Sequence, residues 1–307
     1  MKQVVPHDCR DPTDPCTVTR SARTGILSGM RMETVRQARQ VISYVWTHPA
    51  NRGQRIRSIL RAIAFQVRGR LGKRTLAVIG ARGRMWAELH YTASSNVVYA
   101  NPPNWNEMQA WRRILKPGDL FVDIGSNVGS YAIWTADLGA EVIAVEPDQD
   151  AVLRLRENVA LNDFIIEVQQ CALAGERGRM SLTSGLDTVN HLLMDASATG
   201  QEVEVRTLDD LLGARAAAGV KIDVEGVERL VLDGATRVLA DHRIGVMQLE
   251  WNEMSQLVLS EDRAPVAEIL HSYGYSFYRP DSEGVLHPAD VTDYGPDVFA
   301  VSPTHVL

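Results

Sequence analysis

Cysteine is scarce and long apolar runs are absent in this sequence of 307 residues. The three cysteines are odd in number and form no metal-ligand set, which argues against a disulfide framework and favours a reducing, cytoplasmic setting. No apolar run is long enough to span a membrane, and the first residues contain no apolar signal-peptide core. The sequence therefore indicates neither a disulfide-rich secreted domain nor a membrane-spanning protein.

Basic and acidic residues are unevenly distributed along the chain. The net charge is −6, but residues 1–74 carry +11 and residues 75–307 carry −17. With 45% hydrophobic and 23% charged residues, the composition is that of a soluble globular protein with a large core. We therefore expect a basic amino-terminal segment attached to an acidic body.

Three parts are expected along the chain. Residues 1–32 lack a periodic apolar face and predict a disordered tail. A basic helical segment, 33–74, and a main domain, 75–307, follow. Within the main domain, the polar insertion 174–218 is expected to form a substrate wall or lid. The native start could be Met1, Met30 or Met32.

A basic amphipathic helix is predicted from Arg52 to about Leu71. Residues 52–74 contain eight Lys or Arg and no Asp or Glu. Such a helix can lie on anionic lipid or attract an anionic substrate, but we expect its apolar stripe to pack on the body of the protein. Nucleic-acid binding is not expected, because only Phe65 interleaves with the arginines. The stripe consists of Ile56, Ile59, Leu60, Ile63 and Val67.

The segment from Asp119 to Pro147 predicts a βαβ unit. The apolar run 120–124 is typical of a buried parallel strand, and a turn bearing two glycines follows at 125–129. A helix is expected at 130–138 and a second strand at 142–145. The glycine turn therefore lies at the carboxyl end of the first strand, where open α/β sheets bind ligands.

The turn and the acid after the second strand favour a nucleoside ligand. Gly125 and Gly129 allow close approach to the backbone, and Glu146 can accept hydrogen bonds from both hydroxyls of a ribose. The G-x-G-x-x-G motif of dinucleotide-binding proteins is missing. Instead Asp123 stands two residues before the first glycine and suits a cationic amine. S-adenosylmethionine, which has an amino group, a sulfonium and no phosphate, fits this pattern.

The remaining pattern predicts an α/β fold in which a doubly wound, Rossmann-like sheet has a terminal antiparallel strand pair and is preceded by the amino-terminal helical segment. Helices are expected at 33–46, 52–71, 107–115, 149–161, 228–241 and 264–273. Strands are expected as a hairpin within 75–100, at 165–170, 180–183, 203–206, 220–224 and 245–249, and as the antiparallel pair 275–278 and 297–302.

Charged residues gather where two core strands end. Lys221, Asp223 and Glu225 alternate along one strand, and Glu250 follows the next. Charges at such positions are costly unless they are paired or used. These acids could take a proton, steady a cationic cofactor or hold Mg²⁺, although no metal is specifically indicated. Alternatively, Lys221 simply pairs with one of the acids.

Several motifs together resemble the FkbM-type methyltransferases, which are S-adenosylmethionine-dependent enzymes of class I. The motifs are DIGSNVGSYA, AVEPD, KIDVEGVE and LEWNE, and the resemblance extends from Glu107 to Ser302. It implies the class I methyltransferase sheet and O-methylation of a hydroxyl on a sugar, glycolipid or polyketide-type natural product. The residues expected to bind the cofactor are Asp123, Gly125, Ser126, Asn127, Gly129, Glu146, Pro147, Asp148, Cys171 and Ala172.

The expected reaction is direct in-line transfer of the methyl group to an acceptor oxygen. A base that removes the hydroxyl proton should accelerate it by roughly 10²–10⁴-fold. Asp223 is the first candidate, followed by Glu250, Glu225 and the loop residue His191. Two alternatives remain open: a nicotinamide-dependent oxidoreductase, and a homologue that binds the cofactor without catalysis.

Overall fold

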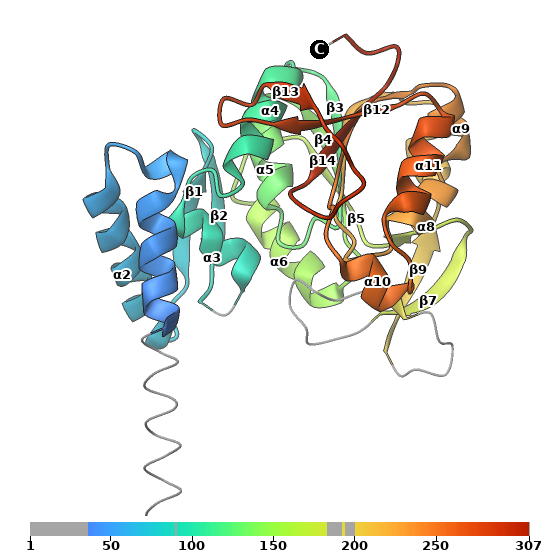
Figure 1. Cartoon of the computed structure of the whole chain (residues 1–307). Coiled ribbons are helices and arrows are strands. Elements are labelled where there is room, and N and C mark those ends of the chain that lie inside the picture. The colour runs from blue at the N-terminus through green and yellow to red at the C-terminus, as the bar shows by residue number, and fades with distance from the viewer. Residues whose placement is uncertain (1–35, 90, 183–191, 194–199, 307) are drawn as a thin grey trace, which may run out of the picture.

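A computed structural model of the chain describes residues 36–89, 91–182, 192–193 and 200–306 (Figure 1). The predicted tail 1–32, with its possible starts Met30 and Met32, lies outside the described residues, and so does His191. No helix among the described residues has the length and apolar character needed to cross a bilayer.

The fold is organised around an eight-stranded sheet in the order β13-β12-β14-β11-β10-β3-β4-β5. Its five parallel strands are β3 (Leu120–Ile124), β4 (Glu141–Val145), β5 (Ile166–Gln169), β10 (Ala217–Ile222) and β11 (Ile244–Leu249). The strand order reverses between β3 and β10, so the carboxyl ends of these two neighbours border a crevice. The predicted doubly wound sheet is confirmed.

Three antiparallel strands complete the sheet beside β11. They are β12 (Ser276–Pro280), β13 (Leu286–Pro288) and β14 (Val298–Val301). The predicted terminal pair corresponds to β12 and β14, whereas β13 was not expected. Because β14 runs opposite to β11, its amino end lies at the edge where the parallel strands finish.

Each face of the sheet is covered by its own apolar core. Along β3, Phe121 belongs to one core and Val122 to the other, as expected for a strand that is buried on both sides. The first core includes side chains of α4 (Trp105–Ile114), α5 (Ser130–Asp137) and α6 (Gln149–Val159). The second includes those of α7 (Leu208–Leu212), α8 (Glu228–Asp233), α9 (Thr236–Ala240) and α11 (Ala264–Ser272).

The amino-terminal part packs beside the first core. Residues 36–47 are helical, and η1 (Pro49–Asn51) and α2 (Arg55–Arg70) follow. The hairpin of β1 (Thr75–Ile79) and β2 (Gly83–Ala87) and the helix α3 (Thr92–Tyr99) lie between α2 and the central sheet (Figure 1). The predicted hairpin is confirmed; α3 was not expected.

The expected packing of the apolar stripe of α2 is wrong. The helix buries Ser58, Ala62 and Phe65 instead. The Phe65 ring packs edge-on against Tyr99 of α3, and Ser58 donates to the Asn51 side chain, so this side of the helix faces the body and the larger aliphatic residues face outward. Four residues of the stripe are more than half exposed: Ile56 (70%), Leu60 (62%), Ile63 (51%) and Val67 (54%).

A second, four-stranded sheet is formed by the segment after β5. Its order is β6-β9-β7-β8, with β6 (Ala172–Leu173), β7 (Gly178–Leu182), β8 (Leu192–Leu193) and β9 (Gln201–Arg206). The strands predicted at 180–183 and 203–206 correspond to β7 and β9. A short helix that was not predicted, α10 (Met254–Val258), follows β11.

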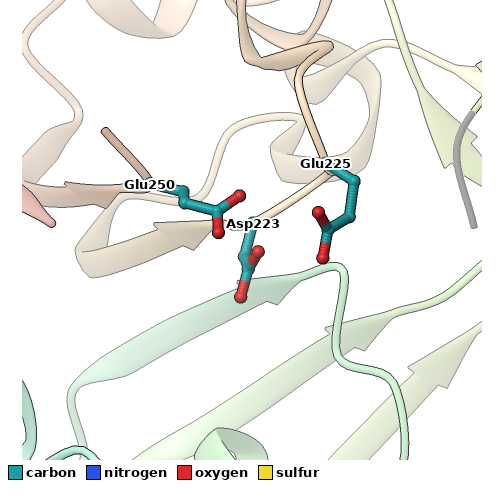
Figure 2. Close-up of side chains that lie close together, drawn as sticks. All are labelled: Asp223, Glu225 and Glu250. Carbon is teal, nitrogen blue, oxygen red and sulfur yellow. The ribbon is translucent and has the colours of Figure 1, made fainter. Parts of the chain in front are cut away.

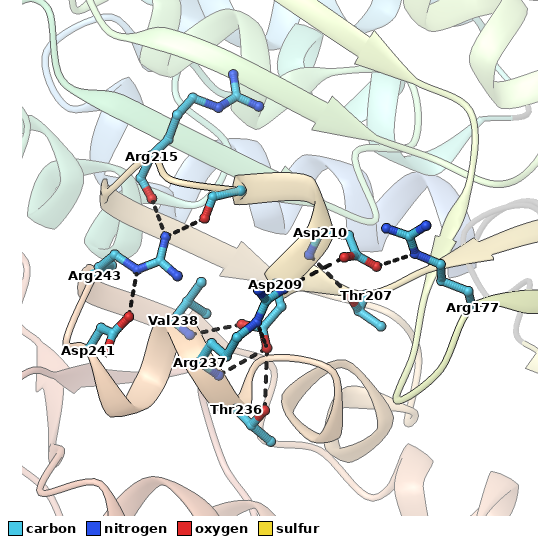
Figure 3. Close-up of polar contacts among 11 residues, drawn as sticks. Arg177, Thr207, Asp209, Asp210, Arg215, Thr236, Arg237, Val238, Asp241 and Arg243 are labelled. Carbon is cyan, nitrogen blue, oxygen red and sulfur yellow. Dashed lines mark hydrogen bonds and ion pairs between the residues drawn. The ribbon is translucent and has the colours of Figure 1, made fainter.

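The helix predicted at 228–241 is two helices, α8 and α9, with a break at Gly234. A Cβ atom on Gly234 would lie 2.1 Å from the carbonyl oxygen of Ala174, so the chain has no room for a side chain there. At the start of α9, the Asp209 carboxylate accepts the N–H groups of Arg237 (3.0 Å) and Val238 (2.8 Å) (Figure 3). A side chain from α7 thus satisfies the free donors of a new helix. Sequence periodicity could not reveal this partner.

A buried ion pair holds the loop that follows β10. Arg263 is 3% exposed and pairs with Glu228, which is fully buried. The other carboxylate oxygen of Glu228 accepts the N–H of Gly226 at 3.1 Å. Arg263 also donates to the carbonyl oxygen of Asn252 at 2.9 Å. The pair therefore connects the loops that follow β10 and β11.

We predict that Arg263→Met destabilises the protein by about 3–5 kcal/mol, because it leaves the Glu228 carboxylate buried without a cation. Urea unfolding would measure the change in the free energy of unfolding. Arg179→Met is the matched control: its ion pair with Glu202 is 70% and 64% exposed, so the loss should stay below about 1 kcal/mol. Equal losses in the two variants would contradict the prediction.

Candidate functional site

A cavity opens at the carboxyl ends of the parallel strands. Its walls come from the turn after β3, the residues after β4 and β5, and the loops after β10 and β11. Asn96 at the end of α3 and Asn104 before α4 also line it. The cavity therefore lies at the topological switch point, where α/β sheets bind ligands.

The turn after β3 is held tightly against β10. Gly125 has φ +80°, and a Cβ atom on it would lie 1.8 Å from the carbonyl oxygen of Asp223. Its N–H and that of Ser126 both donate to the carbonyl oxygen of Val145 at 3.0 Å. Asn127 adopts φ +48°, a left-handed conformation that asparagine tolerates better than most residues. The conformation of the turn therefore depends on glycine at position 125 and asparagine at position 127.

Asp123 lies beneath this turn and has one free acceptor. The residue is 1% exposed, and its Oδ2 accepts the N–H of Ala132 at 3.0 Å. Its Oδ1 is buried and has no hydrogen-bond partner among the described residues. Burial raises the pKa of Asp123 to about 6. A donor entering the cavity would satisfy this oxygen.

Glu146 also has spare acceptor capacity. Its Oε2 accepts the N–H of Asn127 at 2.8 Å, and its Oε1 accepts the N–H of Asp148 at 2.9 Å. A carboxylate has about four acceptor positions, so each oxygen can accept a further bond. Burial raises the pKa of Glu146 to about 7. Two hydroxyl groups of one ligand would suit this carboxylate.

Three acids form a cluster where the loops after β10 and β11 line the cavity (Figure 2). One carboxylate oxygen from each of Asp223, Glu225 and Glu250 lies within 4.8 Å of the others. Burial, followed by the charge of Asp223, raises the pKa of Glu225 to about 7 and that of Glu250 to about 9. The Oε2 atom of Glu250 is buried and has no partner among the described residues.

Lys221 supplies the positive charge beside this cluster. Its side chain is 5% exposed, and its Nζ lies 2.6 Å from Oδ2 of Asp223 and 4.7 Å from the centre of the Tyr131 ring. Burial alone would lower the pKa of Lys221, but the charges of Asp223 and Asp123 raise it above its ordinary value. The pairing of Lys221 with a neighbouring acid, left open by the sequence, is therefore present.

The cavity wall is strongly acidic. Among the described residues that line it, Lys221 is the one basic side chain. The acids are Asp123, Glu146, Asp148, Asp223, Glu225, Glu250 and Asp297. Such a wall favours a cationic ligand and disfavours a pyrophosphate.

The sequence did not identify Asp297 and Tyr131 as site residues. Asp297 immediately precedes β14, whose amino end meets the carboxyl ends of the parallel strands. It accepts a hydrogen bond from Gln248 at 2.7 Å, and burial raises its pKa to about 7. The sequence predicted that the last strand is antiparallel. Such a strand begins at the edge where the parallel strands end, so this prediction could have placed Asp297 at the site.

The cavity gathers nearly all the site residues expected from the sequence. Every expected residue that the structure describes lines it, except Gly129. Gly129 has φ +93° and precedes α5. Cys171 and Ala172 are both in the wall, and burial raises the pKa of the Cys171 thiol to about 11. His191, expected as a possible base, lies outside the described residues.

Sequence comparison finds relatives with methyltransferase names. The 31-O-demethyl-FK506 methyltransferase FkbM of Streptomyces tacrolimicus is 30% identical over 181 residues, which cover 47% of this chain and 65% of that protein. A ribosomal protein L11 methyltransferase of Caldicellulosiruptor saccharolyticus is 44% identical over 64 residues, covering 20% of this chain and 21% of that protein. The matches thus span less than two thirds of either relative.

Among solved structures, the 16S rRNA N2 G1207 methyltransferase RsmC of T. thermophilus is 18% identical with a TM-score of 0.42, covering 75% of this chain and 50% of that chain. The magnesium protoporphyrin IX methyltransferase ChlM of Synechocystis PCC 6803 with bound SAM is 16% identical with a TM-score of 0.39, covering 69% of this chain and 84% of that chain.

A sequence profile described as "Methyltransferase FkbM domain" matches residues 123–277, just over half of the chain. The match begins at Asp123 in the first site strand and includes the β3–α5 turn, Glu146 and the acid cluster. The resemblance seen in the motifs is confirmed: the chain belongs to the FkbM methyltransferase domain family.

Proposed function

We propose that this chain transfers a methyl group from S-adenosylmethionine to a hydroxyl oxygen of a small molecule. The observation that carries the proposal is the acidic wall of the cavity, in which seven carboxyl groups face one lysine. A cofactor with two cationic centres and no phosphate suits such a wall. Family membership supports the same reading.

The residues of the cavity fit S-adenosylmethionine. Oδ1 of Asp123 is a buried acceptor without a partner among the described residues, and it could accept a hydrogen bond from the amino group. Glu146 has free acceptor positions for the two ribose hydroxyls. Cys171 and Ala172 offer a wall beside the adenine. When bound, the cofactor supplies an electrophilic methyl group on a positively charged sulfur.

Glu250 is the base that we propose ahead of Asp223. The carboxylate of Asp223 is engaged by Lys221 at 2.6 Å, whereas Oε2 of Glu250 has no partner among the described residues. A base must be ionised to act, and an efficient base has a pKa near the working pH. The pKa of Glu225 is raised to about 7, and that of Glu250, raised to about 9, would fall when a positively charged sulfur lies beside it. In the transfer, the methyl carbon would leave sulfur as it bonds to the acceptor oxygen, and the Glu250 carboxylate would take the hydroxyl proton.

Lys221 and Asp223 hold this region in place. Lys221 lies against the Tyr131 ring and pairs with Asp223, whose backbone N–H donates to the carbonyl oxygen of Ile124 at 3.0 Å. Both residues stand at the end of β10, which pairs with β3. We propose a positioning role for these two residues, which keep the acid cluster beside the glycine turn.

The acceptor that we propose is a sugar, glycolipid or polyketide-type hydroxyl. The name of the Streptomyces tacrolimicus relative, a 31-O-demethyl-FK506 methyltransferase, supports an oxygen acceptor on a natural product. Asn96 and Asn104 also line the cavity, but they precede residues 123–277, the part of the chain that matches the family domain. The residues proposed to bind the cofactor all lie within that part. We propose that the segments carrying Asn96 and Asn104 contribute to acceptor choice.

We predict that Glu146→Ala raises the dissociation constant for S-adenosylhomocysteine by about 10–100-fold, because hydrogen bonds to a charged acceptor are lost. Isothermal titration calorimetry would measure it. Glu146→Gln keeps the shape and one acceptor oxygen, so its effect should be smaller. Circular dichroism should show that both variants remain folded.

Absence of S-adenosylhomocysteine binding by the folded wild-type protein would contradict the proposed cofactor. Titration with NADH would then test the oxidoreductase alternative. Binding of the cofactor without methyl transfer to any acceptor would instead support the non-catalytic alternative.

We predict that Glu250→Gln lowers the rate of methyl transfer by roughly 10²–10⁴-fold while S-adenosylhomocysteine still binds. The rate of S-adenosylhomocysteine formation would be followed with 31-O-demethyl-FK506 as the first acceptor to be tested. Glu141→Gln, an exposed site at the amino end of β4, is the matched control. A wild-type rate in Glu250→Gln would rule out this residue as the base.

The acid cluster also predicts a pH dependence of cofactor choice. Glu225 and Glu250 lose protons as the pH rises through about 7 and about 9, and only the ionised carboxylates attract the sulfonium. The preference for S-adenosylmethionine over S-adenosylhomocysteine should therefore grow from pH 6 to pH 9, by roughly tenfold. The growth should be smaller in Glu250→Gln.

We predict that methyl transfer does not require a metal ion. The three carboxylate oxygens lie close enough to hold Mg²⁺, but Lys221 already compensates the charge of Asp223 and occupies its Oδ2. Treatment with EDTA followed by dialysis should leave the rate unchanged. Loss of activity that Mg²⁺ alone restores would assign a metal to the cluster.

A further inference from the structure

Helix α2 presents an apolar face to the outside of the molecule. This face is named the α2 stripe. It consists of the exposed residues Ile56, Leu60, Ile63 and Val67 of the helix and of Leu71, which directly follows it. Each side chain is 51–70% exposed. The spacing of three or four residues places them along one side of the helix, opposite the buried Ser58, Ala62 and Phe65. A contiguous row of exposed aliphatic side chains marks an interaction surface.

Arginines border the α2 stripe on both sides. With about 3.6 residues per turn, Arg57 and Arg68 lie along one side of the stripe and Arg70 along the other. All three are exposed. Arg68 donates to the carbonyl oxygen of Arg74 at 3.3 Å, and Arg70 donates to the side-chain oxygen of Gln66 at 2.7 Å. These acceptors are neutral, so the arginine charges stay available to a partner.

Exposed apolar and basic side chains are also found near the amino end of α2. Trp46, at the end of the preceding helix, is 47% exposed, and the Arg55 guanidinium lies 5.4 Å from the centre of its ring. Ile42 in the same helix is also 47% exposed. Figure 1 places α2 on the outer side of the molecule, separated from the central sheet by the hairpin and α3. The surface can therefore meet a partner without covering the cavity residues after β10 and β11.

We propose that the α2 stripe and its arginines bind the surface of an anionic lipid bilayer. The aliphatic side chains would enter the boundary between headgroups and acyl chains, and the arginines would contact lipid phosphates. Residues 52–74 contain no acid that would repel this surface. The proposal does not depend on the proposed methyl transfer.

A lipid surface fits these residues better than two other partners do. A second copy packed on the same face would bring two sets of arginines together without acids from this segment to compensate them. A nucleic acid would pair with the arginines but leave the aliphatic stripe against a polar backbone. An anionic bilayer satisfies the apolar and the cationic parts at once.

The test is co-sedimentation of the full chain with lipid vesicles. Wild-type protein should sediment with vesicles of phosphatidylcholine and phosphatidylglycerol, but not with phosphatidylcholine alone, and binding should weaken as salt is raised. Replacing Leu60, Ile63 and Val67 with Gln, a good helix former, should weaken binding at least tenfold. Replacing Arg57 and Arg68 with Gln should weaken it several-fold.

A matched control replaces exposed aliphatic residues elsewhere. Ile165→Gln with Leu257→Gln alters side chains that are 70% and 73% exposed, and it should leave vesicle binding unchanged. Circular dichroism and S-adenosylhomocysteine titration would show that each variant is folded. The proposal is overturned if wild-type protein does not sediment with anionic vesicles, or if the control loses as much binding as the stripe variant. Sedimentation velocity showing a dimer that only the stripe variant dissociates, without vesicle binding, would assign the face to self-association.

Discussion

The Lys221–Asp223 ion pair is the interaction on which the site depends. It lies at the switch point of the sheet, where the ends of β3 and β10 are neighbours and where seven carboxyl groups line one cavity. Without this cation the buried acids would repel one another, and this repulsion would strongly destabilise the folded state. Among the described residues, Glu225 and Glu250 form no ion pair with a basic side chain, and burial and the neighbouring negative charges raise their pKa values. The same arrangement stabilises the sheet edge.

The backbone around this pair is constrained as strongly as its charges. There is no room for a side chain at Gly125 beside the carbonyl oxygen of Asp223, and the N–H of Asp223 donates to the carbonyl oxygen of Ile124 at 3.0 Å, so the glycine turn and the acid-bearing loop are packed together. On the far side, Glu228 accepts the N–H of Gly226 and pairs with Arg263, which in turn binds the loop after β11. Buried contacts therefore hold the glycine turn, the loop after β10 and the loop after β11 together. Preorganisation of this kind lets a site align reacting groups without ordering them during the reaction.

The amino-terminal part leaves many of its aliphatic side chains exposed. In the parallel strands apolar side chains on both faces are buried, whereas α2 buries its small residues and turns its aliphatic ones outward. An apolar stripe on a helix predicts a surface that packs against it. The stripe does not show whether this surface belongs to the same chain or to another molecule. Here α3 packs against the side of α2 that carries Phe65, and the side that carries the aliphatic residues, bordered by arginines, stays exposed. The negative charge of the body and the positive charge of this segment are thus separated in space as well as in sequence.

Local patterns in the sequence determined the β3–α5–β4 unit, its glycine turn and the places of Asp123, Glu146, Asp223 and Glu250, because strand ends and turn residues depend on neighbours along the chain. The family followed from the same motifs. Only the tertiary structure decided that Asp297 joins the cavity, that Asp209 starts a new helix at α9, and that Lys221 pairs with Asp223. It also decided which side of α2 is buried. Each of these depends on a contact between segments far apart in sequence, and periodicity within one segment carries no information about the surface that another segment will present to it.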